Sequence, residues 1–413
     1  MVRNLDHINT ARPLIMHIDL NSCFATVEQQ AHPTLRGRPV AIVNRRTEHT
    51  SIITASYEAK RCGVTLGMSI VEARKICPGI IALESDPPKY RHVYHKLLDI
   101  MNDYSSHVRM KSIDEGVIDF SESPLDISNR DLKDVGNEIK QRLRDEIGCA
   151  IRCNVGIGTN RFLAKTAAGL NKPDGLDEIT ADNLKQVLAS MKLTDINGIA
   201  YHMERRLNAV GVYTPLEFFD SSATTLEKVV FKSICGQQWY QRLRGWEVDK
   251  RDFPLRSAGR QYVLEEYKMP RELIIQRLHH LCEEVGAKIR SKNLVARGVY
   301  VYAKGYESGR WQARHMASLP FFSDQAIYSL VLKMFENAPL EVKEIGVTCY
   351  ELSYDDNPQL SLFGDELART QRLVSAVDEI NNRYGRRVIH SADTLETNTF
   401  VRQKIPFGST RYL

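Results

Sequence analysis

Hydrophobic and polar residues alternate along residues 14–172 in two periods, one typical of strands and one typical of helices. Apolar positions at every second residue predict a strand over Leu14–Leu20, and Asn21 or Ser22 then suits the cap of a helix. Asp19 therefore falls at a strand-to-helix junction. The same patterns predict strands at 38–44, 50–57 and 150–159, a hairpin at 111–120, and helices at 57–77 (broken at Gly63 and Gly67), 89–107, 132–147 and 161–172. Strands and helices mixed in this way indicate an α+β domain.

Short helices and then a second mixed module are predicted for the rest of the chain. Helices 182–191 and 202–210 enclose the turn INGIA, which either holds a nucleic-acid backbone at a helix start or belongs to a small bundle. Residues 246–260 are polar and charged, as in a linker. The later elements are strands at 262–267, 296–304 and 344–352, helices at 271–288 and 325–335, an acidic loop from 355, and a helix at 365–384. We expect the last residues, 401–413, to be loosely structured.

Two adjacent carboxylates interrupt the apolar stretch 111–120. In a regular strand Asp114 and Glu115 would point to opposite faces, so either the chain bends near Gly116 or one carboxylate faces water. At a hairpin turn such a pair can be a plain surface feature. Burial of both carboxylates is costly unless a divalent cation balances them. Together with Asp19, they would suit a pair of Mg²⁺ ions.

Composition indicates a folded protein of several compact units. The 413 residues are 43% hydrophobic, and the formal net charge of +5 permits a polyanionic partner without demanding one. The eight cysteines form no paired CxxC motifs, which argues against zinc knuckles and favours reduced thiols. No window is apolar enough for a membrane span, and the first residues do not resemble a signal peptide. We therefore expect a soluble intracellular protein.

Five segments occur together in this chain: HIDLNSCFATVE, SYEAKRCGVTLGM, SIDEG, NVGIGTNRFLAKTAA and NKPDG. Their order and spacing resemble those of the Y-family translesion DNA polymerases. The resemblance to the bacterial polymerase IV and polymerase V catalytic subunits covers residues 10–355. It implies a low-fidelity, template-directed enzyme that performs translesion synthesis, transferring a nucleotide from a dNTP to a primer 3′-hydroxyl with the help of two metal ions.

The resemblance also implies a right-hand α+β fold of palm, fingers and thumb with an extra little-finger domain. The expected limits are 1–22 and 84–178 for the palm, 23–83 for the fingers, 179–246 for the thumb, 247–258 for a linker, 259–354 for the little finger, and 355–413 for a clamp-binding peptide and C-terminal extension. Small residues of the fingers, such as Ser51 and Gly67, would leave room for damaged templates. Basic residues between 256 and 314 would hold the duplex backbone, although such a bias is often only a solvated surface.

By the same resemblance, Asp19, Asp114 and Glu115 are the catalytic and metal-binding carboxylates. The resemblance further implies that the carbonyl of Leu20 is a metal ligand and that the cofactor is a pair of Mg²⁺ ions, for which Mn²⁺ is able to substitute.

The resemblance places the incoming dNTP among Phe24, Thr54, Tyr57, Lys60 and Lys172. Phe24 is at the position of an aromatic steric gate against a 2′-hydroxyl, although a lone apolar helix residue would ordinarily be core. The other four would hold the triphosphate.

Four positions depart from the family pattern. Lys60 stands where an arginine is usual and lacks the bidentate fork, so that Arg61 could substitute for it. Asn21 replaces a second aspartate, and Cys23 replaces an aromatic residue before the gate. Ala200 replaces a glycine of the INGIA turn, which puts in doubt how closely that turn approaches a phosphate.

Gln359-Leu-Ser-Leu-Phe363 resembles the peptide that binds the bacterial sliding clamp. Leu360, Leu362 and Phe363 would enter an apolar pocket, and Gln359 would fix the register. The alternative is a tail that docks on its own protein. The expected partners are primer–template DNA, a dNTP and the clamp, and the expected state is a monomer.

Two other functions are compatible with parts of the sequence. One is a catalytically silent relative that acts as a clamp-bound scaffold at damaged DNA. The presence of all three carboxylates argues against it. The other is a palm-type nucleotidyl cyclase, which would need neither the thumb nor the clamp peptide. The expected location is the bacterial cytoplasm, with association to the nucleoid when the enzyme is engaged.

Overall fold

The computed structural model describes residues 7–401 apart from 46, 125, 126, 128, 251–253, 267, 308, 340 and 355–365. The described residues form two compact units, one within 7–250 and the other within 254–401. None of the described helices is both long enough and apolar enough to cross a membrane. All eight cysteines are free thiols.

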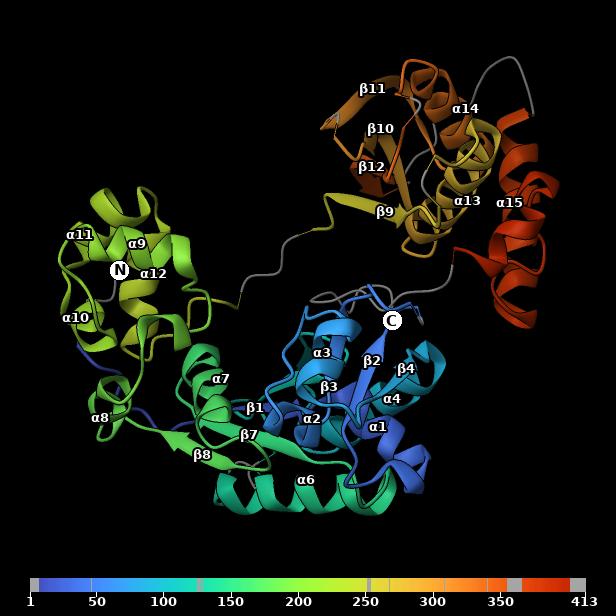
Figure 1. Ribbon diagram of the computed structural model, residues 1–413. Coiled ribbons are helices and arrows are strands. Elements are labelled where there is room, and N and C mark those ends of the chain that lie inside the picture. Colours follow the sequence, from blue (N-terminus) through green and yellow to red (C-terminus); the bar gives the residue numbers. More distant parts are fainter. Residues whose placement is uncertain are drawn as a thin grey trace. The chain divides into compact units, whose positions relative to one another are not determined.

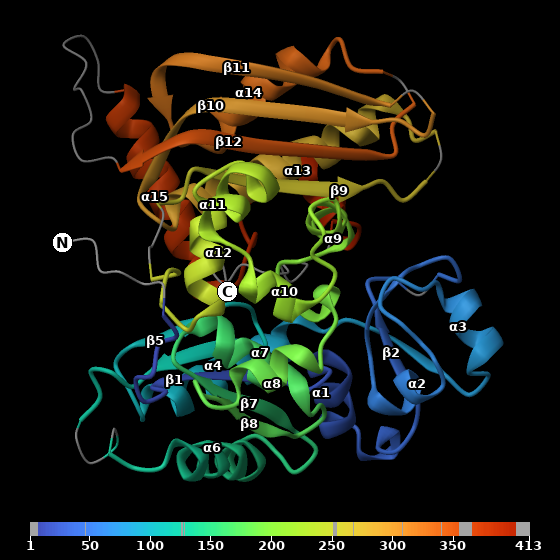
Figure 2. The ribbon, with the colours of Figure 1, turned by 90° about the vertical axis from the view of Figure 1, so that its left-hand side faces the viewer.

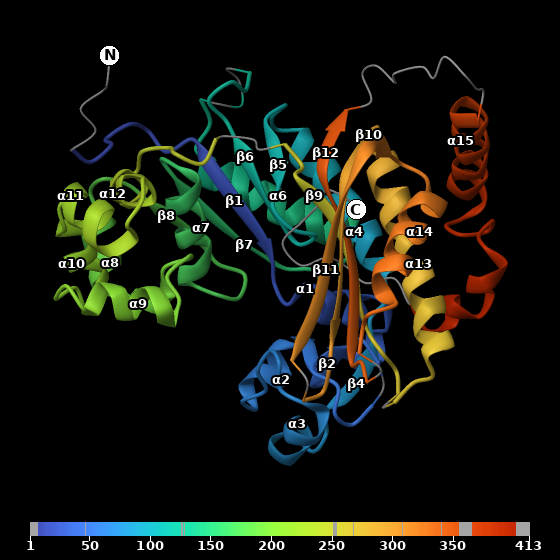
Figure 3. The same ribbon diagram turned by 90° about the horizontal axis from the view of Figure 1, so that it is seen from above.

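The first unit is built around a five-stranded sheet with the order β5-β6-β1-β7-β8 (Figure 3). β1 is antiparallel to both of its neighbours, β6 and β7. The predicted hairpin is confirmed, and its chain reversal lies at 111–114, so that Asp114 belongs to the turn and Glu115 begins a strand. The strands are β1 (Ile15–Leu20), β5 (Val108–Met110), β6 (Glu115–Asp119), β7 (Cys153–Gly158) and β8 (Leu176–Ile179).

The alternation of side chains along β1 distributes them between two layers of helices. Met16, Ile18 and Leu20 lie in the main hydrophobic core with apolar residues of α1, α4 and α6. Ile15 packs on the opposite face with Ala164 of α7, so His17 and Asp19 also point to the α7 side. Figures 1 and 2 show α7 over this face of the sheet and α6 over the other. These helices are α1 (Cys23–Ala31), α4 (Pro87–Asn102), α6 (Leu132–Glu146) and α7 (Arg161–Leu170).

Two glycines of β7 let α7 lie directly against the sheet. A Cβ atom on Gly156 would come 2.0 Å from the Ala164 carbonyl oxygen, and one on Gly158 would come 2.6 Å from the Ala164 nitrogen. Both distances are far below van der Waals contact, so these positions require glycine. The motif NVGIGT thus places α7 above the strand ends that carry Asp19 and Glu115.

Two smaller regions complete the first unit. A three-stranded sheet with the order β3-β2-β4 has its own apolar cluster, in the stretch predicted as fingers. A helical region in the stretch predicted as thumb packs around Phe218 and Trp239 and shares its core with Phe162 of α7. The elements are β2 (Val40–Val43), β3 (Ile52–Ala55), β4 (Ile81–Glu84), α2 (Tyr57–Arg61), α3 (Ile70–Ile76), α8 (Leu184–Ala189), α9 (Tyr201–Asn208), α10 (Pro215–Asp220), α11 (Ala223–Thr225) and α12 (Cys235–Leu243).

The second unit is a four-stranded antiparallel sheet with the order β11-β10-β12-β9. Helices α13 and α14 pack together against one face of it. Strands β9 and β10, joined through α13, have β12 between them, which is a split β-α-β unit. The elements are β9 (Ser257–Val263), α13 (Arg271–Arg290), β10 (Leu294–Lys304), β11 (Arg310–Phe321), α14 (Asp324–Phe335) and β12 (Glu344–Tyr354).

The chain after residue 365 folds back on the helical side of this second unit. Helix α15 (Glu366–Tyr384) and a 3₁₀ segment, Ala392–Thr399, lie beyond α13 (Figure 1). The buried His280 of α13 shares a hydrogen bond with Thr397, and the Tyr262 hydroxyl donates to the Phe400 carbonyl. The extension is therefore part of the unit's fold.

Two predicted elements were wrong in their limits, and the strand β11 was missed. Helix α4 ends at Asn102, because the residues up to 107 turn into the edge strand β5. β9 occupies residues 257–263. It therefore begins inside the predicted linker, and it ends four residues before the end of the predicted strand 262–267. The edge strand β11 was not predicted at all, because most of its side chains are exposed.

Candidate active site

The carboxylates of Asp19, Asp114 and Glu115 are brought together by the pairing of β1 with β6. Asp19 stands directly opposite Glu115 in this pair, and the Leu20 amide donates to the Asp114 carbonyl at 2.8 Å. Placing Asp114 in the turn and Glu115 in the strand resolves the conflict between adjacent side chains, because the two residues have different backbone geometry. Residues distant in sequence thus meet at one edge of the sheet.

Glu115 accepts hydrogen bonds from two cationic or potentially cationic side chains. His17 Nε2 lies 3.1 Å from Oε2, and Lys165 Nζ lies 3.0 and 2.8 Å from the two carboxylate oxygens. Burial would raise the pKa of Glu115, but the bonds from His17 and Lys165 outweigh it and lower this pKa to about 2. Glu115 is therefore ionised throughout the physiological range.

Asp114 is in the opposite electrostatic situation. Burial raises its pKa above the ordinary value; the Ser112 hydroxyl, which donates to its carboxylate, opposes this, and the charges of Asp19 and Glu115 add to the rise. Asp114 therefore lies in an environment with too much negative charge, which a bound cation would relieve.

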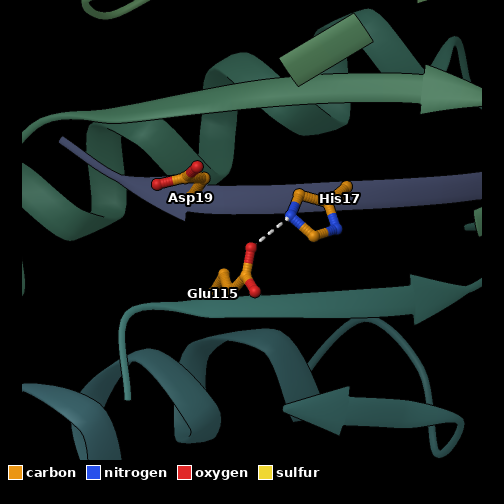
Figure 4. A group of neighbouring side chains, drawn as sticks. All are labelled: His17, Asp19 and Glu115. Atoms are coloured by element: carbon orange, nitrogen blue, oxygen red, sulfur yellow. Dashed lines mark hydrogen bonds and ion pairs between the residues drawn. The ribbon is translucent and has the colours of Figure 1, made fainter. Parts of the chain in front are cut away.

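A metal-binding geometry is formed by His17, Asp19 and Glu115 (Figure 4). One ligand atom from each lies within 4.8 Å of the others. The set is two carboxylates and one imidazole, which suits a divalent ion. Asp114 is not part of this trio, although its pKa responds to two of the members.

Three of the predicted nucleotide-binding residues surround Asp19. Lys172 Nζ lies 2.5 Å from Asp19 Oδ2, and Lys60 Nζ donates to the Ser22 hydroxyl at 2.8 Å. Burial and then the charge of Lys172 lower the pKa of Lys60, while Asp19 opposes this. Burial and the charge of Asp19 raise the pKa of Tyr57. Lys60, Lys172 and Tyr57 thus share one electrostatic environment with a candidate metal ligand.

The structure gives the remaining predicted residues less direct support. The Thr54 hydroxyl donates to the Ile53 carbonyl at 2.8 Å. Phe24 is buried and stacks on Tyr90 of α4, with ring centroids 4.4 Å apart. The Leu20 carbonyl has no contact that assigns it a role. The predicted clamp-binding residues Gln359, Leu360, Leu362 and Phe363 lie outside the described residues.

Ser22 departs from its prediction as a helix cap. It occupies the cap position of α1, but its backbone is left-handed, with φ of 47°, and its side chain makes no capping hydrogen bond. Asn21 does not cap the helix either. Its side-chain nitrogen Nδ2 donates to Asn154 Oδ1 at 2.9 Å, and its side-chain oxygen Oδ1 accepts from the Asp174 backbone amide at 2.8 Å. Asn21 thereby holds the loop that carries Lys172.

The sequence analysis missed His17 and Lys165 as members of this site. His17 lies two residues before Asp19, so strand periodicity could have placed both side chains on one face. Lys165 lies in a quoted motif, but its contact with Glu115 depends on the close approach of α7 to β7, which periodicity does not show.

Family models and relatives agree with this arrangement. Residues 18–169 match the impB/mucB/samB family, and residues 264–362 match its C-terminal domain. The chain is 33% identical to DNA polymerase IV of Moorella thermoacetica over 399 residues, covering 92% of this chain and 96% of that protein. It is 27% identical to DNA polymerase IV 1 of Bacillus subtilis, covering 93% of each.

Solved structures support the same fold. A Y-family DNA polymerase chimera of Dbh and Dpo4 matches with a TM-score of 0.69 and 22% identity, covering 83% of this chain and 99% of that one. An insertion ternary complex of Dbh DNA polymerase matches with a TM-score of 0.57 and the same identity and coverage. The α+β right-hand fold expected from the motifs is confirmed. The chain belongs to the impB/mucB/samB family of Y-family DNA polymerases.

Proposed function

We propose that this DNA-directed DNA polymerase extends a primer past damaged template bases by two-metal nucleotidyl transfer, with low fidelity. Family membership indicates the template-directed polymerase class. The observation that carries the metal mechanism is the meeting of Asp19 and Glu115 across β1 and β6, with Asp114 in the adjoining turn. Carboxylates so close together need cations to balance them.

The residues present fit divalent cations. Asp19, Asp114 and Glu115 offer oxygen ligands, and the raised pKa of Asp114 is what a carboxylate lacking sufficient positive charge would show. When bound, two Mg²⁺ ions, or Mn²⁺ in their place, lower the pKa of an attacking primer 3′-hydroxyl and stabilise a leaving pyrophosphate. In this proposal the Leu20 carbonyl is a further ligand, and the low pKa of Glu115 keeps it ready to bind a cation.

The nucleotide lies, in this proposal, over α1 and the start of α2. Lys60 and Lys172 pair with the triphosphate, and Tyr57 and Thr54 orient it with their hydroxyls. Phe24 limits the space beside the sugar, and its stacking on Tyr90 holds the ring in place. Weak geometric selection by the small three-stranded sheet region accounts for low fidelity.

The partners in this proposal are primer–template DNA, a dNTP and a sliding clamp that binds Gln359–Phe363. Substituting Leu362 and Phe363 by alanine should abolish stimulation by the clamp and leave synthesis without the clamp intact. Equal stimulation of the wild type and the double variant would count against the clamp motif.

A primer-extension assay with Mg²⁺ and dNTPs tests the main proposal. The wild type should extend the primer, and Asp114→Asn and Glu115→Gln should abolish extension while DNA binding, measured by fluorescence anisotropy, persists. A wild type that binds DNA but does not extend it would contradict the proposal and favour a silent scaffold.

A further inference from the structure

Three ammonium groups lie among the three carboxylates of the candidate active site. Lys172 Nζ contacts Asp19 at 2.5 Å, and Lys165 Nζ contacts both oxygens of Glu115. Lys60 is close enough that the charges of Lys172 and Asp19 both act on its pKa. The formal charges of these six side chains therefore sum to zero, with lysine contacts on Asp19 and Glu115, whereas Asp114 keeps a raised pKa.

We propose that Lys172 is a transferable counter-ion, which neutralises Asp19 until a nucleotide arrives and then pairs with the triphosphate. This inference rests on the proposed function. Its consequence is that divalent cations and dNTP bind cooperatively. The triphosphate draws Lys172 away from Asp19, which frees this carboxylate for a cation. The cations in turn neutralise the carboxylates that would repel the triphosphate.

Charge balance supports the cooperativity. Divalent cations alone would place excess positive charge beside Lys172, Lys165 and Lys60, whereas a triphosphate alone would meet three carboxylates. Two divalent cations and one triphosphate carry similar and opposite charges, so their joint arrival preserves the balance. A site that is neutral without ligands therefore favours the pair over either ligand alone.

The fold lets Lys172 exchange partners without moving its backbone. The Asn21 side chain accepts from the Asp174 amide at 2.8 Å, and the Asn154 side chain donates to the Asn171 carbonyl at 3.1 Å, so the loop is held on both sides of Lys172. The Lys172 side chain is 37% exposed, and its four-carbon stem is flexible. The Lys165 side chain is equally exposed, but it contacts both oxygens of Glu115 from within a helix packed on the sheet.

Mn²⁺ titration, followed by electron paramagnetic resonance, tests the inference on the full chain bound to a dideoxy-terminated primer and template. A non-hydrolysable dNTP analogue should tighten Mn²⁺ binding to the wild type about tenfold. Without the analogue, Lys172→Met should bind Mn²⁺ about fivefold more tightly than the wild type, because the competing charge is gone. The analogue should then tighten Mn²⁺ binding by this variant much less.

Matched variants separate the possible results. Lys133→Met removes the same charge at an exposed pair with Glu178 and should bind Mn²⁺ as the wild type does. Lys172→Arg keeps the charge and should retain the effect of the analogue. Wild-type Mn²⁺ affinity in Lys172→Met, together with weakened binding in Asp19→Asn, would overturn the counter-ion role alone. Undiminished binding in Asp19→Asn would overturn the metal site and the proposed function with it.

Discussion

Two clusters of partly buried charge lie in different units of the chain, and their carboxylates are paired with different kinds of cationic side chain. In the second unit, Glu283 of α13 accepts hydrogen bonds from the Arg387 guanidinium, the Ser391 amide at 2.8 Å and the Thr394 hydroxyl at 3.0 Å. Arg290 likewise binds Asp324 and Asp378. In the first unit, the carboxylates around Asp19 are contacted by long lysine side chains, and Asp114 keeps a raised pKa.

The difference separates a structural cluster from a functional one. The planar Arg387 guanidinium, the Ser391 amide and the Thr394 hydroxyl hold Glu283 in one position, so that cluster joins the C-terminal extension to α13. Ammonium groups on flexible stems can exchange partners. Burial raises the pKa of one aspartate in each cluster, Asp114 in the first and Asp324 in the second, so the kind of cationic side chain is what distinguishes the clusters. Each prediction below changes one of these clusters.

The largest expected effect is on catalysis by the first cluster. Asp114→Asn should lower the primer-extension rate by about a thousandfold or more, because a metal ligand is lost. The free energy of unfolding of the first unit should stay the same or rise, since a repelling charge has been removed. Single-turnover kinetics and urea unfolding measure the two quantities, and a large loss of stability would contradict this assignment of Asp114.

A change in the second cluster should lower stability and leave catalysis nearly unchanged. Glu283→Ala leaves Arg387 without its carboxylate and should lower the free energy of unfolding of the second unit by about 3 kcal/mol. Hydrogen exchange of α13 in the full chain measures this, and primer extension at room temperature should remain near the wild-type rate. The control is Glu341→Gln, at an exposed pair with Lys268, which should change stability by less than about 0.5 kcal/mol.

The pH dependence of stability should reveal the lowered pKa of Glu115. Its pKa of about 2 in the folded chain lies below the ordinary 4.5, so the ionised form stabilises the fold above about pH 4.5. This contribution, about 2 kcal/mol, is lost as the pH falls toward 2. The free energy of unfolding, measured in urea, should therefore fall less between pH 5 and pH 3 for Glu115→Gln than for the wild type. An identical difference in both would argue against the His17 and Lys165 bonds.

The smallest effect is expected for Asn21, which holds the Lys172 loop. Asn21→Ala removes hydrogen bonds to Asn154 and Asp174 and should cost about 1 kcal/mol of stability. Because Lys172 becomes less well placed, the KM for dNTP should rise several-fold while kcat changes little. A fall in kcat at unchanged KM would point to a different role for Asn21.

Sequence alone predicted the parts of the fold that are encoded locally. Asp19 at a strand end and the hairpin around Asp114 and Glu115 follow from periodicity and turn-forming residues, and the motifs supplied the family. The strand β11 escaped because residues such as Arg310 and Arg314 look like an exposed loop; it is a strand only through its pairing with β10. The contacts Lys172–Asp19 and Lys165–Glu115 also escaped, because they depend on packing between distant segments.

The seam between α7 and β7 extends the catalytic centre to residues that never meet a substrate. Any side chain on Gly156 would collide with the backbone of α7 and lift the helix, and Lys165 would be lifted with it. A random mutagenesis screen scored only for DNA synthesis would then rank Gly156 beside the carboxylates. The small size of the glycine hydrogen at that position therefore sets the distance between the Lys165 ammonium and the Glu115 carboxylate.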